Sequence, residues 1–190
     1  MNGRTSELAR FATNVLNPFF IFTALYALVA FDEADWGSAA LYVALDLLAA
    51  GVVAGYVLLM RRLKRVGDFW ITTRAERLIP AIVLLTVFVL LLTALALLDA
   101  PRGLYDLTLS MGLASAAVAA ITFFWKASAH CAVAGHAAVA GLLLLGPLGL
   151  IFLLALPLVV WSRVTLTVHT LPQALAGTAV GALFALLFLT

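Results

Sequence analysis

Long apolar runs separated by short polar connections make up nearly the whole sequence. The hydrocarbon core of a bilayer is about 30 Å thick, and a helix needs about 20 apolar residues to cross it. Runs of this kind predict transmembrane helices over residues 11–31, 39–60, 78–98, 104–124 and 171–189. The pattern therefore predicts one all-α domain over residues 1–190, a polytopic helical bundle in a membrane.

Residues 131 to 161 show a different pattern. The apolar runs 131–145 and 148–161 are both shorter than an ordinary span, and Gly146, Pro147 and Gly149 lie around their junction. A proline flanked by glycines favours a turn. The sequence therefore predicts two short helices, which either cross the membrane or form a re-entrant hairpin, and about six to seven transmembrane segments in all.

Composition supports a membrane protein. Of 190 residues, 65% are hydrophobic and only 11% are charged, and the mean hydropathy is +1.17. Soluble domains carry about 25% charged residues, and a chain this short cannot hide so much apolar surface in one core. A soluble enzyme and a nucleic-acid-binding protein are therefore excluded, and no nucleic-acid partner is expected. The single cysteine, Cys131, forms no internal disulfide.

The basic residues gather on the side of the predicted bundle that holds the N-terminus, and only Arg102 falls on the other side. They are Arg4, Arg10, Arg61, Arg62, Lys64, Arg65, Arg74, Arg77, Lys126 and Arg163. Most acidic residues, Asp32 and Asp35 among them, fall opposite. Because basic residues mark the cytoplasmic side, we expect an integral protein of the cell (inner) membrane with its N-terminus in the cytoplasm.

Three polar clusters lie on that same side. The first, residues 68–80, contains Arg74 and Arg77, which are three residues apart and so share a helix face. The second, residues 125–130, reads WKASAH and contains Lys126, Ser128 and His130. The third, residues 161–173, reads WSRVTLTVHTLPQ and contains Ser162, Arg163, His169 and Gln173.

Each cluster lies at or just before the start of a predicted helix. A helix N-terminus presents free backbone N–H groups and a partial positive charge, both of which favour a bound anion. Arginine makes forked contacts to phosphate oxygens, and histidine is suited to nucleophilic attack and proton transfer near neutral pH. The three clusters together predict a phosphate pocket at the membrane surface.

The order and spacing of these elements also carry a resemblance. The elements are Arg74, Arg77 and Pro80, then Ser128 and His130, then Ser162, Arg163 and His169. Over roughly residues 68–185 the chain resembles the type 2 phosphatidic acid phosphatase superfamily, and the Ala-Gly of QALAG fits it too. The resemblance implies that His169 attacks phosphorus to give a phosphohistidine and that His130 protonates the leaving oxygen. It implies phosphate binding by the serines and arginines of the three elements, and neither a metal nor another cofactor.

The chain departs from the family pattern at several points. Trp70 stands where the first motif has a lysine, and we expect Lys126 to supply the missing cation. The second motif reads ASAH in place of PSGH. Gln173 replaces the aspartate expected beyond His169, so we expect its carbonyl to orient the His169 ring without adding negative charge. These changes predict a slower or divergent enzyme, or an inactive binding relative.

The function expected is hydrolysis of a phosphate monoester or diphosphate of a lipid, of the phosphatidic acid or prenyl phosphate type. The alternative is a non-catalytic protein that binds or transports a lipid phosphate. Phosphate release by wild type but not by a His169→Ala variant would separate the two. The expected partners are the substrate and membrane lipids.

Three further features are open to two interpretations. Gly177 and Gly181 predict close helix packing, either within the chain or between protomers of a homo-oligomer. His136 lies within an apolar helix, where we expect a packing or supporting role. Asp46 is an intramembrane carboxylate, which we expect either to meet water or to be protonated and hydrogen-bonded, in preference to a functional role.

Overall fold

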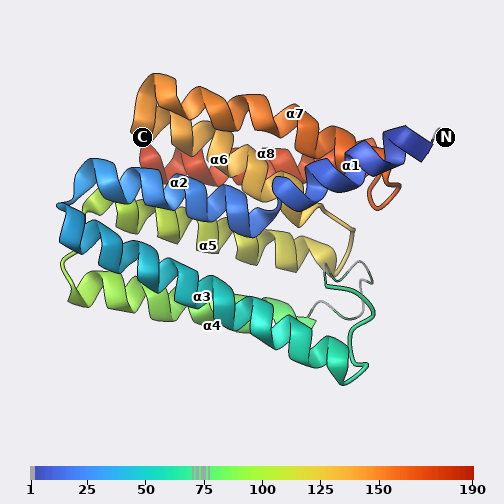
Figure 1. Ribbon diagram of the computed structural model, residues 1–190, viewed down its shortest axis with the longest axis horizontal. Coiled ribbons are helices and arrows are strands. Elements are labelled where there is room, and N and C mark those ends of the chain that lie inside the picture. Colours follow the sequence, from blue (N-terminus) through green and yellow to red (C-terminus); the bar gives the residue numbers. More distant parts are fainter. Residues whose placement is uncertain (1–2, 70, 72, 74–75, 77) are drawn as a thin grey trace.

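The computed structural model describes residues 3–69, 71, 73, 76 and 78–190, and most of them lie in long helices (Figure 1). The elements are α1 (Gly3–Val15), α2 (Pro18–Glu33), α3 (Trp36–Arg62), α4 (Leu78–Leu97), α5 (Arg102–Thr122), α6 (Ala129–Leu145), the 3-10 helix η2 (Gly146–Gly149), α7 (Leu150–Thr165) and α8 (Leu171–Leu189). By length and composition, five stretches of the described chain can cross a membrane, or six when the bent pair α1–α2 counts as one span. The predicted all-α membrane bundle is confirmed.

The first predicted span, 11–31, is a broken one. The helix axis bends by 42° between α1 and α2, at Asn17 and Pro18. Asn17 has an extended backbone, with φ −79° and ψ 161°, because a residue that precedes proline avoids the α region. Pro18 then begins α2, where its missing N–H costs nothing. The Asn17 side chain accepts a hydrogen bond from the N–H of Phe20 at 3.1 Å and caps the new helix.

Helices α2, α3, α4 and α5 pack in a ring, each against its two neighbours. Helices α6, α7 and α8 form a second group that packs against α2 and α5, and α1 lies along α7 (Figure 1). At the end of the ring away from the N-terminus, the Glu33 carboxylate accepts a hydrogen bond from the N–H of Leu104 at 3.2 Å. This contact ties the last turn of α2 to the first turn of α5.

Small residues bring α6 and α8 into backbone contact. A Cβ atom at Gly177 would overlap the carbonyl oxygen of Ser128, and one at Gly181 would overlap that of Ala132. Close approach of this kind is how helices associate in lipid, where apolar side chains alone give little driving force. The packing predicted from these two glycines is therefore within the chain, and it fixes the start of α6 beside the start of α8.

Helices α6 and α7 form an antiparallel hairpin. The turn begins at Gly146, whose φ of +55° is one that glycine adopts easily. At about 25 Å each, the two helices are shorter than a typical span, yet they run the length of the bundle beside α8 (Figure 1). The 37-residue apolar stretch Ala129–Thr165 is thus a pair of short antiparallel helices, as predicted from the sequence, and the hairpin returns the chain to the end of the bundle where α6 begins.

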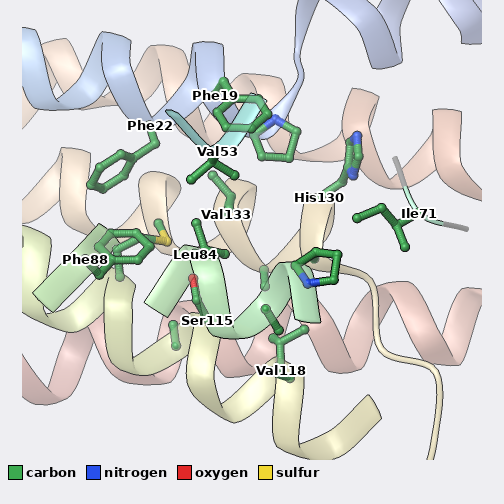
Figure 2. A pocket seen from close by; sticks show the side chains of 18 of the residues that line it. Phe19, Phe22, Val53, Ile71, Leu84, Phe88, Ser115, Val118, His130 and Val133 are labelled. Atoms are coloured by element: carbon green, nitrogen blue, oxygen red, sulfur yellow. The ribbon is translucent and has the colours of Figure 1, made fainter. Parts of the chain in front are cut away.

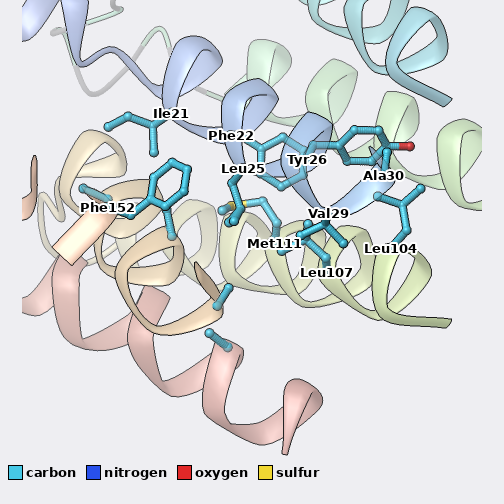
Figure 3. Packing of buried hydrophobic residues seen from close by; sticks show 14 of the residues in the cluster. Ile21, Phe22, Leu25, Tyr26, Val29, Ala30, Leu104, Leu107, Met111 and Phe152 are labelled. Carbon is cyan, nitrogen blue, oxygen red and sulfur yellow. The ribbon is translucent and has the colours of Figure 1, made fainter. Parts of the chain in front are cut away.

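The surface and the interior of the bundle are both apolar. In α4 only 11% of the most apolar 18-residue window is buried, and large apolar side chains such as Ile82, Val89 and Leu90 are exposed on its surface, as expected of a helix that contacts lipid. The half of the bundle farther from the N-terminus is packed solid. Leu25 and Tyr26 of α2 meet Leu104, Leu107 and Met111 of α5 there, all of them buried (Figure 3).

Candidate functional site

His130 is held in the first turn of α6. Ser128 is the N-cap residue, and its hydroxyl oxygen accepts a hydrogen bond from the N–H of Cys131 at 3.4 Å. The backbone N–H of Ser128 in turn donates to the carbonyl oxygen of Gln173 at 3.2 Å. The start of α6 is therefore linked to the first turn of α8, and His130 is buried at the junction.

Arg163 lies in the last turn of α7 and is buried, with only 3% of its surface exposed. Its Nη1 atom donates a hydrogen bond to the hydroxyl of Thr13 in α1 at 2.9 Å. A buried guanidinium needs polar partners because removal from water is costly. The contact fixes the direction of the arginine and attaches α1 to the end of α7.

His169 is brought back toward Arg163 by the turn that follows α7. Thr167 adopts a left-handed backbone with φ +55°, and the N–H of His169 donates to the carbonyl oxygen of Arg163 at 3.3 Å. The His169 side chain is buried. The turn thus brings together two functional candidates that have five residues between them in the sequence.

Gln173 belongs to a capping box at the start of α8. Its side-chain oxygen accepts from the N–H of Thr170 at 3.1 Å, and its own N–H donates to the Thr170 hydroxyl at 3.4 Å. This reciprocal pair satisfies two free donors of the helix. The carbonyl that we expected to orient the His169 ring therefore serves the helix cap, next to His169 in the chain.

Of the other predicted phosphate ligands, the structure describes Ser162 and Lys126. Ser162 is buried, and its hydroxyl donates to the carbonyl oxygen of Val159 at 2.8 Å, so that its hydrogen bond lies within α7. Lys126 is half-buried in the connection between α5 and α6. Arg74 and Arg77 lie outside the described residues.

His130, Arg163 and His169 line one cavity of about 500 Å³ inside the bundle. Its wall is otherwise almost entirely apolar and comes mainly from α2, α3, α4, α5 and α6. Figure 2 shows His130 and Ile71 toward one end, with Phe22 and Phe88 toward the other. Phe69 covers part of the first end and packs on Phe19, with ring centroids 6.3 Å apart.

One polar pair lies deep in this cavity. The Asp46 carboxylate, 3% exposed, accepts a hydrogen bond from the Thr23 hydroxyl at 2.6 Å, and both residues line the cavity. Asp46 is thus hydrogen-bonded, which was one of the two expected states. Its place in the cavity could not be read from sequence, where the only signal was a carboxylate in an apolar helix.

His136 is separate from the cavity lining. It is fully buried, and its Nε2 atom is 2.7 Å from the hydroxyl oxygen of Ser110 in α5. That serine also donates to the carbonyl oxygen of Leu107 at 3.0 Å. The packing role expected for His136 agrees with this position.

Two imidazoles and a guanidinium at one end of an apolar chamber suit a ligand with an anionic head and a hydrocarbon body. Among the described residues, no group of three or more histidine, cysteine, aspartate or glutamate side chains is arranged to hold a metal ion. Comparisons of the chain with protein-family models, curated proteins and solved structures find no match.

Proposed function

We propose that this protein is an integral membrane phosphatase that hydrolyses a phosphate monoester or diphosphate of a lipid. The observation that carries the proposal is that His130, Arg163 and His169 line the same apolar cavity, although they come from α6, α7 and the connection to α8. The cavity suits the chain of a lipid, and its polar end suits a phosphate. The resemblance of the three sequence elements to the type 2 phosphatidic acid phosphatases supports the same chemistry.

The reaction has two steps. A ring nitrogen of His169 attacks phosphorus, an N–P bond forms, and the ester P–O bond breaks as His130 gives a proton to the leaving oxygen. His130 then takes a proton from water, the water oxygen attacks phosphorus, and the N–P bond breaks to release inorganic phosphate.

Arg163 stabilises the charge on the transferring phosphoryl group. Positioning and electrostatic stabilisation supply most of the catalysis in phosphoryl transfer. A guanidinium held by Thr13 is already oriented before the substrate arrives, and the N-terminus of α6 adds partial positive charge beside His130. Lys126 is proposed as a further cation at this end of the bundle, which the positive-inside rule assigns to the cytoplasm. Arg74 and Arg77, which lie outside the described residues, are proposed as phosphate ligands from the sequence alone.

The test uses purified protein in lipid nanodiscs with a chelator present. Phosphatidic acid, prenyl phosphate and prenyl diphosphate are supplied, and inorganic phosphate is measured. We expect release by wild type, none by His169→Asn, and a loss of about 10²–10⁴-fold in His130→Asn, the usual contribution of a general acid. Labelled phosphate should be trapped on histidine, in an acid-labile and base-stable form, in wild type and not in His169→Asn.

The matched control is His136→Asn, which removes the third histidine of the chain from a site beside Ser110. We expect this variant to keep turnover in proportion to the amount of folded protein. Equal phosphate release by wild type and His169→Asn would contradict the proposal. Binding of a lipid phosphonate without any phosphate release would replace it by the binding or transport function.

A further inference from the structure

The cavity has a definite inner limit. On each of the four ring helices, the lining residue farthest from the His130 end marks that limit: Thr23 on α2, Asp46 on α3, Leu91 on α4 and Met111 on α5. We call these four residues the floor. Beyond the floor lies the solid packing of Leu25, Tyr26, Leu104 and Leu107 (Figure 3), so the cavity does not continue through the bundle.

The depth of the cavity matches half a bilayer. Its lining extends from Val57 to Asp46 on α3 and from Leu78 to Leu91 on α4, which at 1.5 Å per residue is about 17 Å and about 20 Å. One leaflet of a bilayer has about 15 Å of hydrocarbon, half of the roughly 30 Å core. When the phosphate of a lipid lies beside His169, the last carbons of a hydrocarbon chain about one leaflet long therefore lie at the floor.

The floor carries a buried carboxylate, whereas the wall above it is mostly apolar, with Ser115 and Thr122 as its hydroxyl groups. The wall consists of residues such as Val53, Leu84, Phe88 and Val118 (Figure 2), which accept methylene groups. At the floor the chain meets the Asp46–Thr23 pair, and an apolar chain end pressed against a carboxyl group satisfies none of its hydrogen bonds. A chain that ends short of this pair is accepted, whereas a longer one must bend back or displace it.

We propose that the cavity holds one hydrocarbon chain of the lipid phosphate, and that the Asp46–Thr23 pair limits the length of that chain. This inference rests on the proposed function for the location of the phosphate at the His130 end. It assigns to Asp46 a role in substrate selection, through the depth and polarity of the floor, and no role in the chemical step. The substrate class is then a lipid phosphate with a chain about one leaflet long.

The first test locates the chain without any turnover. An alkyl phosphonate with a photoreactive diazirine at its chain end is incorporated into nanodiscs that contain the protein, and labelled residues are mapped by mass spectrometry. We expect labelling of Leu91 and Met111. Ala119→Phe, which fills the middle of the cavity from α5, should reduce that labelling by about fivefold or more, the factor that corresponds to roughly 1 kcal/mol. Ala120→Phe is the matched control. Residue 120 is the next one in the chain and is exposed, so this variant should leave the labelling unchanged.

The second test measures length selection. Two lipid phosphates with the same head group, one with a leaflet-length chain and one longer by several carbons, are supplied in the same vesicle. We expect Asp46→Ala to raise the turnover ratio of the long to the short substrate by about fivefold or more, and Thr23→Ser, which keeps the hydroxyl, to leave the ratio unchanged. Met111→Ala deepens the same floor from α5, and it should raise the ratio if Asp46→Ala does not fold.

The outcomes separate the two proposals. Floor labelling without phosphate release would overturn the phosphatase and keep the chain site. Phosphate release with labels only on outward-facing residues such as Leu90, or with an unchanged length ratio in a folded Asp46→Ala or Met111→Ala protein, would overturn the chain site and keep the phosphatase.

Discussion

The guanidinium of Arg163 and the hydroxyl of Thr13 are 2.9 Å apart, although 150 residues separate them in the chain. Thr13 is near the end of α1, and the break at Asn17 and Pro18 follows directly. The bend therefore allows α1 to lie along α7 while α2 enters the ring that encloses the cavity. The first helix of the protein thus orients an arginine that the last third of the chain supplies.

Thr13→Val should lower kcat/KM for lipid phosphate hydrolysis by about tenfold or more. A hydrogen bond to a charged group is worth about 1.5–3 kcal/mol, and its loss leaves the Arg163 guanidinium less well oriented. Thr13→Ser should restore most of the activity. Thr86→Val is the matched control, because the Thr86 hydroxyl bonds only to the Ile82 carbonyl oxygen of its own helix. Equal effects at both threonines would contradict the orienting role.

Gly181→Ala should destabilise the protein by about 1–3 kcal/mol, because the added methyl group overlaps the Ala132 carbonyl oxygen and overpacking has costs of this size. Gly55→Ala in α3 is the matched control. It meets nothing within 4 Å, and it should stabilise that helix by up to about 1 kcal/mol. Thermal unfolding in detergent measures both variants. A Gly181→Ala midpoint equal to that of wild type would contradict the close packing of α6 and α8.

Gln173→Glu should move the acid limb of the kcat/KM profile to higher pH. Glutamate retains the capping box, and it adds a negative charge four residues after His169 in the chain. A nearby negative charge favours the protonated imidazole, so neutral His169, the proposed nucleophile, forms only at higher pH. Gln173→Ala removes the cap without adding charge and should leave the limb where it is. A shift of equal size in both variants would show that the cap, and not the charge, controls the histidine.

Protonation of Asp35 at acid pH should destabilise the N-terminus of α3, which this residue caps. Hydrogen bonds from the side chain and backbone of Ser38 lower the pKa of this carboxyl below its ordinary value of 3.8. A lowered pKa means that the stabilisation is complete above the ordinary value and is lost as pH falls through the lower folded one. Thermal unfolding of wild type between pH 2 and 5, compared with Asp35→Asn, measures the effect. If the unfolding temperatures of wild type and Asp35→Asn change with pH in the same way, the prediction is wrong.

Helix positions were largely accessible from sequence, because the length of an apolar run nearly equals the length of its helix. The prediction of 171–189 agrees with α8, and 78–98 agrees with α4 to within one residue. The break in the first span was missed because hydropathy averages over its window. The local signal was the Asn17-Pro18 dipeptide, because a residue that precedes proline avoids the α region.

Only part of the site could be predicted from the sequence. His130, Arg163 and His169 were predicted together and do line one cavity. Sequence could not show that Ser162 bonds within its own helix, because the rotation of a helix end depends on tertiary packing. It also could not show that Thr23 and Asp46 meet, since nothing local couples residues on two neighbouring helices. Pairs of this kind are fixed by how whole helices pack.

The solid half of the bundle has a consequence for the cell. The proposed reaction requires water at the end of the cavity that His130, Arg163 and His169 line, and a membrane that carries an electrochemical gradient cannot tolerate a continuous water path through the protein. Tyr26, Leu104 and Leu107 close that path with tightly packed side chains. If the cavity holds the proposed reaction, this packing would separate water at the histidine end from the far end of the bundle, and the proton and ion gradients of the membrane would be preserved.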